Sequence, residues 1–245
     1  MLSRYLPVFI VLSLIAEILG TVGGFGSSVF FVPIANFFLD FQSVLGITAL
    51  YHVSSNITKI AFFRKGLDKK VIIQLGIPAV IFVIIGGFLS QYLDPIILTY
   101  LLGIFLIVLS SVFLIFKKLA VKATAKNAII GGTLSGLSAG ILGTGGAIRG
   151  ITLSAFKMNK DKFIATSAVI DLGVDFSRTL VYYYNGYMRK DLLYLIPILI
   201  VIGILGTWIG KQVLHKISQE QFRYIVLFLI LGIGLASVLS TISSA

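Results

Sequence analysis

The chain has 245 residues, of which 58% are hydrophobic and 12% are charged, and its mean hydropathy is +1.05. This composition leaves too little polar surface to cover a soluble globule, so it excludes a soluble domain and predicts a multi-pass membrane protein. The formal net charge is +11, but the lysines and arginines lie mostly between apolar runs, which is typical of topology signals and not of a nucleic-acid-binding surface. The sequence contains no cysteine, which excludes disulfides, thiolate metal sites and a thiol nucleophile.

The first half of the chain is predicted to form five membrane segments. The first helix is expected to be retained and not cleaved, because Glu17 interrupts its apolar run and no small-residue cleavage pattern follows. Glycines break this run at residues 18 to 26, and the next run is only about 18 Å long as a helix, too short to cross a bilayer. The expected segments are residues 5 to 23, the short run 27 to 39 with Pro33, and residues 43 to 63, 71 to 93 and 95 to 116.

The second half repeats this order of segments. A helix from about Asn127 breaks at a second glycine cluster, residues 141 to 150, and a short run continues to Phe156. Three longer runs follow, at about 163 to 184, 192 to 214 and 222 to 240. A basic linker separates the halves, so we expect a first transmembrane repeat at residues 1 to 121 and a second at 122 to 245, within one membrane domain. The lysines of this linker are Lys117, Lys118, Lys122 and Lys126.

Charge placement predicts the orientation of the segments. The connections at residues 64 to 70 and 117 to 126 are basic, which places them in the cytoplasm, and the connections at Asp40 and Asp94 are acidic. Arg189 and Lys190 run against this assignment. An odd number of segments in each half inserts the halves in opposite directions. The predicted fold class is therefore an all-α polytopic membrane protein with two inverted-topology repeats of about five segments, each including one short or broken helix.

The two glycine breaks are the first candidate site. Free backbone at membrane depth is tolerated only inside protein or along a cavity, and N–H groups at the start of a helix attract anions. Close helix packing is the alternative role for these glycines. The occurrence of two matched clusters, each followed by a short run, favours a site. The candidate anion-binding residues are Gly23, Gly24, Gly26, Ser27, Gly145 and Gly146, with Ser28, Thr144 and Thr152 as further hydroxyl donors.

Arg149 lies inside the second glycine cluster, far from an evident membrane end. An unpaired guanidinium is costly at that depth, so Arg149 needs either an anionic ligand, which it would bind bidentately, or an internal carboxylate. The carboxylates available for a structural ion pair are Asp171, Asp175 and Glu17. Both roles are open from the sequence, and they are compatible if they alternate during transport.

Two polar triplets share one spacing along the chain. His52, Asn56 and Lys59 are placed at i, i+4 and i+7, as are Asp171, Asp175 and Arg178, so each triplet lines one helix face. We predict that Asn56, Lys59 and Arg178 bind substrate, with the alternative that Lys59 and Arg178 reach the membrane interface from their helix ends. The candidates for proton coupling are Glu17, His52, Asp171 and Asp175, and fixed ion pairs are the alternative.

The glycine pattern resembles the TauE/SafE family of sulfite and organosulfonate exporters. The likeness rests on Gly23-Gly24-Phe25-Gly26 followed by Pro33, on Gly143-Thr144-Gly145-Gly146, on the helix start at residues 164 to 168 and on the basic link between halves. It covers nearly the whole chain. Arg149 departs from the pattern, because a glycine or a small residue is expected at the end of the second cluster.

The resemblance implies a secondary transporter in the cell membrane that exports small sulfur-containing anions such as sulfite, thiosulfate or organosulfonates, with the glycine clusters along the substrate path. The alternatives are a cation- or proton-coupled carrier of another small metabolite and a non-transporting intramembrane enzyme or assembly subunit. The expected partners are a small anionic substrate and membrane lipids, without nucleic acid. No catalytic residue, metal site or cofactor is predicted, and the sequence favours no particular oligomeric state.

Overall fold

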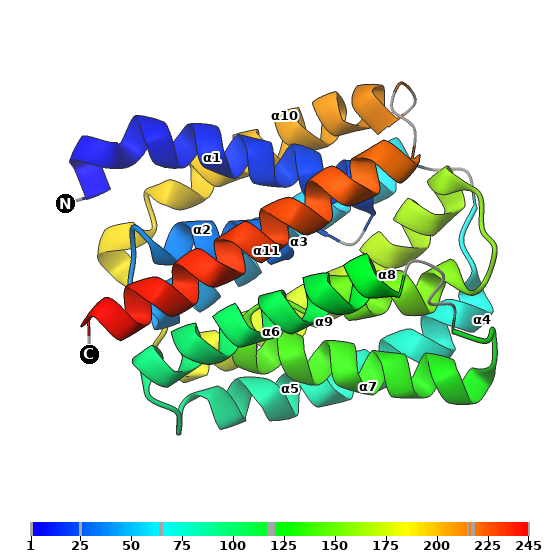
Figure 1. Cartoon of the computed structure of the whole chain (residues 1–245), viewed down its shortest axis with the longest axis horizontal. Coiled ribbons are helices and arrows are strands. Elements are labelled where there is room, and N and C mark those ends of the chain that lie inside the picture. The colour runs from blue at the N-terminus through cyan, green and yellow to red at the C-terminus, as the bar shows by residue number, and fades with distance from the viewer. Residues whose placement is uncertain are drawn as a thin grey trace.

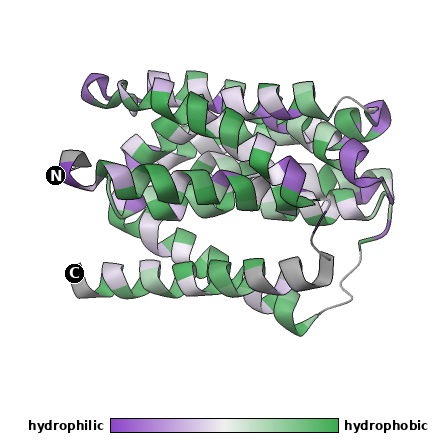
Figure 2. Cartoon of the chain, turned by 90° about the horizontal axis from the view of Figure 1, so that it is seen from above, coloured by the Kyte–Doolittle hydropathy of each residue, from purple (hydrophilic) through white to green (hydrophobic). Residues whose placement is uncertain are grey.

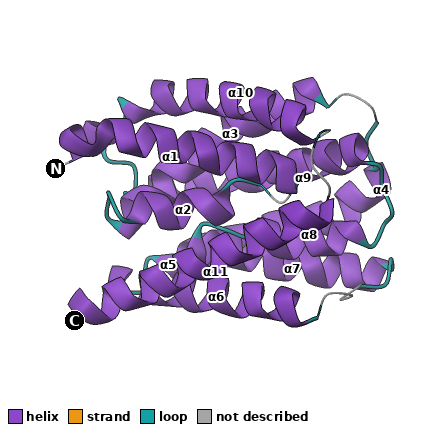
Figure 3. Ribbon diagram, turned by 45° about the horizontal axis from the view of Figure 1, so that its top comes forward, coloured by secondary structure: helices purple, strands orange, loops and turns teal. Residues whose placement is uncertain are grey.

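A computed structural model describes residues 2–24, 26–63, 66–116, 121–214, 216 and 219–244. Within these ranges the chain is a bundle of helices without strands (Figure 3), which confirms the predicted all-α class. Some residues of the predicted motifs and basic connections lie outside the described residues, namely Phe25, Arg64, Lys65, Lys117 and Lys118.

The helices follow the predicted order, with one short helix after each glycine break (Figure 1). The first half contains α1 (Leu2–Gly23), α2 (Ser28–Asn36), α3 (Phe41–Phe62), α4 (Lys69–Val71), the π-helical η1 (Ile72–Gly76), α5 (Ile77–Ser90) and α6 (Pro95–Ile115). The second half contains α7 (Ala125–Leu142), α8 (Gly146–Ser154), α9 (Lys160–Tyr184), the 3₁₀ turn η2 (Lys190–Leu192), α10 (Leu195–Leu214) and α11 (Gln219–Ser244).

Short polar side chains cap the N-termini of several helices. Asp40 accepts a hydrogen bond from the Ser43 amide at 2.9 Å, and Asp94 accepts one from the Ile96 amide at 2.7 Å. Thr124 caps α7 and Asn159 caps α9 in the same way. Each cap satisfies an amide that has no partner within its helix, which explains why the connections between the apolar runs end where they do.

Four of the described helices are long and apolar enough to cross a membrane. They cover Arg4–Gly23, the continuous helix Lys69–Ser90, Pro95–Ile115 and Leu195–Leu214. The helices α3 and α9 have 22 and 25 residues, so they match in length, but they carry the polar triplets and are less apolar. Figure 2 shows hydrophobic residues along the lengths of the helices and hydrophilic ones gathered largely at the ends of the bundle.

The packing of the two halves is symmetric. When the helices are matched in order, α1 corresponds to α7, α3 to α9, α5 to α10 and α6 to α11. In the structure α1 packs against α10, and the corresponding helices α7 and α5 pack against each other in the same way. Two further contacts, α3 with α9 and α6 with α11, each join a helix to its own counterpart in the other half. Exchange of the halves therefore preserves the main helix contacts, as expected for a duplicated chain. Insertion of the halves in opposite directions stays a prediction, as does the boundary near residue 121.

Ion pairs identify the two ends of the bundle. At one end Lys162 pairs with Asp68 at 3.1 Å, and hydrogen bonds from Lys162 and the Val71 amide lower the pKa of Asp68. At the other end Arg189 pairs with Asp40 at 3.3 Å and with Asp191 at 2.6 Å. The acidic residues thus neutralise Arg189, which explains why this arginine can lie at an end that the charge rule assigns to the outside. Both chain termini lie at one end of the bundle (Figure 1).

The absence of native cysteine allows a direct test of the orientation. We expect a membrane-impermeant maleimide added to intact cells to label Tyr92→Cys and Asp191→Cys, because the charge rule predicts that the acidic end faces outwards. Leu67→Cys and Lys157→Cys should react only after the membrane is permeabilised. All four positions are exposed in the structure, and the unsubstituted chain is the unreactive control. The reverse labelling pattern would contradict the orientation.

Candidate functional site

The two glycine breaks meet inside the bundle. The chain leaves α1 through Gly24 and Gly26, which have φ values of 72° and 84°, and it leaves α7 through Gly143, with a φ of 75°. These left-handed conformations are strained for residues with a side chain. Ser28, at the start of α2, donates a hydrogen bond to Thr144 at 3.3 Å. The segments that follow the two breaks are therefore in contact.

The glycines also permit close packing, which was the alternative role. A Cβ atom on Gly20 would overlap the backbone of Ser27, because the chain folds back directly onto α1. Gly145 lies against the backbone of Ser135 on α7, and the Ser135 hydroxyl donates to the Gly145 carbonyl at 2.9 Å. At the second break the glycines thus serve packing, and neither Gly145 nor Gly146 lines the pocket described next.

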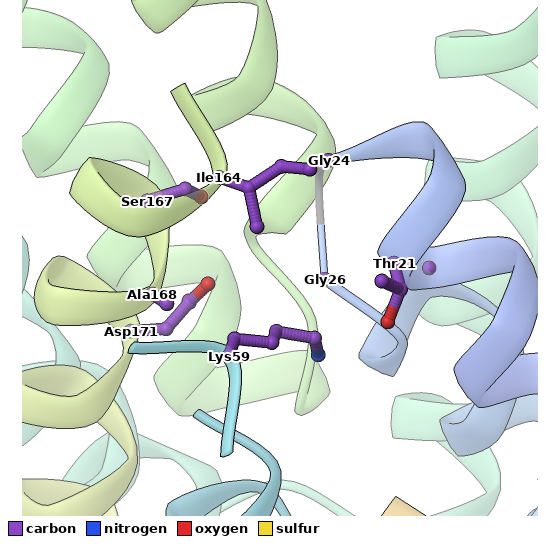
Figure 4. A pocket seen from close by; sticks show the side chains of 9 residues that line it. Thr21, Gly24, Gly26, Lys59, Ile164, Ser167, Ala168 and Asp171 are labelled. Atoms are coloured by element: carbon purple, nitrogen blue, oxygen red, sulfur yellow. The ribbon is translucent and has the colours of Figure 1, made fainter. Parts of the chain in front are cut away.

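A pocket lies between the first glycine break and α9 (Figure 4). Ser167 and Asp171 on α9 face the segment from Gly24 to Gly26 across it, and Lys59 of α3 lies beside them. The short helices α2 and α8 begin nearby, and no side chain of their N-cap residues accepts a hydrogen bond from their first amides. The positive ends of the two helix dipoles are therefore not neutralised by a capping side chain. The lining residues are Gly20, Thr21, Gly24, Gly26, Lys59, Ile164, Ser167, Ala168 and Asp171.

Arg149 lies directly behind this pocket and is 2% exposed. Its guanidinium forms a bidentate ion pair with Asp171, in which Nη2 lies 2.5 Å from Oδ2 and Nη1 contacts Oδ1. Nε donates to the Ser167 hydroxyl at 3.0 Å. Of the three carboxylates that the sequence offered as structural partners, Asp171 is therefore the one that pairs with Arg149 in this conformation.

Glu17 is the centre of a second buried cluster. Lys59 pairs with it at 2.7 Å, so this lysine, which is 4% exposed, does not extend to the membrane interface. The other hydrogen bonds to Glu17 come from hydroxyl groups on α1, α3 and α10 and from the residue before α2. These donors are Thr21, Ser27, Tyr51, Ser55 and Thr207. Glu17 thus joins four parts of the fold.

The third cluster surrounds Arg178, which is 1% exposed and also does not reach the interface. Arg178 pairs with Asp175 at 2.7 Å and donates to the Gly143 carbonyl at 2.6 Å. Asn56 donates to Asp175 at 2.6 Å. His52 links this cluster to the second one, because its ring nitrogens lie 3.5 Å from Arg178 Nη2 and 2.7 Å from the Ser27 hydroxyl. The two triplets, one from each half, thus meet through Asn56 and Asp175 and through His52 and Arg178, but Asn56 and Arg178 lie outside the pocket.

The structure adds residues that the sequence analysis did not single out. Tyr51 and Ser55 bond Glu17, and Ser167 bonds Arg149. Tyr51 and Ser55 are spaced i, i+4 and each directly precedes a member of the first triplet. The polar face of this helix is therefore wider than the triplet, and this width was the signal in the sequence that could have identified them. Thr207 lies in the apolar part of α10, next to Gly206, where α10 packs closely on Glu17 of α1. A polar residue beside a glycine within an apolar run was the weaker signal available for Thr207.

A bundle with an apolar exterior, two broken helices that meet inside it and a buried ionic pocket is the architecture of a membrane transporter. A model of the family described as sulfite exporter TauE/SafE matches residues 9–237, so the chain belongs to this family. A curated relative, described as a probable membrane transporter protein of Methanocaldococcus jannaschii, is 28% identical over 252 residues, which covers 93% of each chain. No solved structure matches the chain significantly.

Proposed function

We propose that this transporter exports small sulfur-containing anions, such as sulfite, thiosulfate or organosulfonates, across the cell membrane. The observation that supports this most directly is the pocket between the first glycine break and α9, because Lys59 lines it and Arg149 lies immediately behind it. Guanidinium and ammonium groups bind oxyanions through charge-assisted hydrogen bonds, and the guanidinium does so bidentately.

Alternating access would follow from movement of one half against the other. The symmetric helix contacts and the meeting of the two glycine breaks support two inverted repeats with a shared site, the arrangement in which broken helices of both halves hold the substrate. In the described conformation the pocket lies beside Ile164, near the end of the bundle that carries Asp68 and Lys162. We assign this end to the cytoplasm, so this conformation would load substrate from inside.

The membrane potential favours export of such a substrate. An inside-negative potential contributes about 2.3 kcal/mol per charge per 100 mV, so a dianion gains roughly 4.6 kcal/mol on leaving at that potential. Export therefore needs no ATP, whereas accumulation inside the cell needs a coupled ion.

The alternative of a cation-coupled carrier of another small metabolite has less support from the site. Each buried carboxylate described above already pairs with a lysine or an arginine. Within the described ranges, no group of three or more histidine, aspartate or glutamate side chains is placed to hold a metal ion. A cation would thus have to compete with three resident cationic side chains.

Counterflow in proteoliposomes tests the proposal. We expect vesicles loaded with unlabelled sulfite or thiosulfate to take up the labelled anion faster than protein-free vesicles, and chloride loading should not support this exchange. Labelled sodium and rubidium serve as cation controls. Cation flux without anion flux would favour the cation carrier, and the absence of both fluxes would favour a protein that does not transport.

A further inference from the structure

The three buried carboxylates differ in what they would lose on protonation. Glu17 accepts hydrogen bonds from six side chains, and it does not line the pocket. Asp175 accepts from Asn56 and Arg178 and is also away from the pocket. Asp171 lines the pocket, its side chain is 13% exposed, and the hydrogen bonds described for it go to Arg149 alone. Asp171 is therefore the carboxylate that a proton reaches most directly, and it has the fewest partner side chains to lose.

The charges around the pocket are balanced before any substrate binds. Lys59 pairs with Glu17, Arg149 with Asp171 and Arg178 with Asp175. An anion that enters this site adds uncompensated negative charge in a region of low dielectric constant, which is costly. Addition of a proton to Asp171 removes one negative charge at the pocket wall and releases the guanidinium of Arg149. Protonation of Asp171 and binding of the anion therefore favour each other.

Asp171 also stands where an oxyanion would bind. Its two oxygens face the two terminal nitrogens of Arg149, the geometry that two oxygens of a sulfite or sulfonate group reproduce. A Cβ atom on Gly26 would lie 3.4 Å from Arg149 Nη2 and 3.6 Å from Asp171 Oδ2. The absence of a side chain at Gly26 thus leaves room beside the ion pair, whose Asp171 carboxylate lines the pocket (Figure 4).

We propose that Asp171 is the coupling residue of this site and that each anion crosses the membrane together with one proton. A dianion that leaves with one proton carries one net negative charge, so the inside-negative potential still favours export, with half of the driving force given above for the dianion alone. A proton from the pocket water adds to a carboxylate oxygen of Asp171, and the ion pair with Arg149 opens. The anion then takes the place of the carboxylate on Arg149. On the other side the anion leaves, Asp171 returns its proton to water and pairs again with Arg149, which restores a neutral site for the return step. This inference rests on the proposed function.

The charged groups around Asp171 determine the electrostatic potential at which it would gain or lose a proton. Arg149 of α8 pairs with it, and Lys59 of α3 lines the same pocket. On α9 the neighbouring charges are Asp175 and Arg178, which pair with each other. Glu17 of α1 acts through its pair with Lys59, and His52 of α3 hydrogen-bonds with Ser27 and Arg178. Protonation of Asp171 therefore leaves the other two ion pairs in place.

The test uses labelled thiosulfate, which stays a dianion across the range from about pH 5.5 to about pH 8, so that titration of the substrate cannot imitate titration of the protein. The full chain is placed in proteoliposomes with an internal pH dye, at equal pH on both sides. We expect thiosulfate uptake to acidify the interior, with one proton per anion, and to rise by up to about tenfold for each unit of acidification.

Variants assign the effect to Asp171. We expect Asp171→Asn to carry thiosulfate without proton movement and with a flat pH profile, and Asp171→Glu to restore both the proton movement and the pH response. Asp175→Asn should retain the acid stimulation even if its rate falls, and the exposed Asp191→Asn should behave like the unsubstituted protein. If Asp171→Asn does not fold, the proton movement of the unsubstituted protein still decides the question.

Two results would overturn the inference in different ways. Thiosulfate transport that carries no protons and does not respond to pH would remove the coupling and leave anion transport standing. Transport of neither thiosulfate, sulfite nor a sulfonate by the unsubstituted protein would remove the proposed function together with the coupling.

Discussion

Replacement of Arg149 by glutamine is expected to lower anion transport by at least about 100-fold. The substitution removes the bidentate donor behind the pocket, and loss of one partner of a buried charge contact costs about 3–5 kcal/mol, a factor of more than 100 in an equilibrium constant. Initial rates of labelled sulfite counterflow, normalised to the amount of folded protein in the vesicles, measure the effect.

A set of matched variants separates the loss of binding from the loss of folding. Arg149→Gln leaves Asp171 without its guanidinium, so the double variant Arg149→Gln with Asp171→Asn should regain thermal stability but not transport. Arg149→Lys keeps the charge and loses the bidentate geometry, so its rate should lie between those of the unsubstituted protein and of Arg149→Gln. Arg189→Gln, which removes an exposed arginine that also pairs with carboxylates, is the control. Transport by Arg149→Gln at the normal rate would exclude Arg149 from the site.

The buried ionic clusters could be predicted in part from residue spacing. The i, i+4, i+7 pattern places His52, Asn56 and Lys59 on one face of α3, and the structure joins this face to the corresponding face of α9 through the bond from Asn56 to Asp175. Spacing along a helix does not determine which charges pair across helices, because the partner depends on the rotation and height of the neighbouring helix. For this reason the sequence left three carboxylates open for Arg149, and the structure selects Asp171.

The unequal roles of the two glycine breaks could not be predicted from their sequences, which share Ile-Leu-Gly-Thr and a Gly-Gly pair. The first break lines the pocket through Gly24 and Gly26, whereas Gly145 of the second lies against Ser135. At the second break the backbone of Ser135 on α7 lies against Gly145, and the Ser135 hydroxyl donates to the Gly145 carbonyl. The sequence of the break therefore predicts a bend in the helix, but the way the segment after the bend packs, here against Ser135 of the preceding helix α7, decides whether the bend faces a pocket.

Replacement of Glu17 by glutamine is expected to lower the free energy of unfolding by about 3–5 kcal/mol, the usual cost of leaving one member of a buried ion pair without its partner. Glu17 is 0% exposed and accepts from Lys59 on α3 at 2.7 Å, from Thr207 on α10 at 3.1 Å and from Ser27 at 2.5 Å. A neutral amide has one oxygen in place of two and adds donors where the neighbours already donate. The charge of Lys59 then stays buried without compensation.

Unfolding of the purified protein in mixed micelles by denaturant, followed by far-ultraviolet circular dichroism, measures this effect. The double variant Glu17→Gln with Lys59→Met removes both charges, so it should recover more than half of the lost stability, because the penalty comes mainly from the unpaired ammonium group. Asp191→Asn removes an exposed carboxylate and should change the free energy of unfolding by less than about 0.5 kcal/mol. If Glu17→Gln were as stable as Asp191→Asn, the ion pair with Lys59 would not hold α1 to α3, and the stability of this region would have to come from apolar contacts such as those of Phe9 with Phe31 and Phe38.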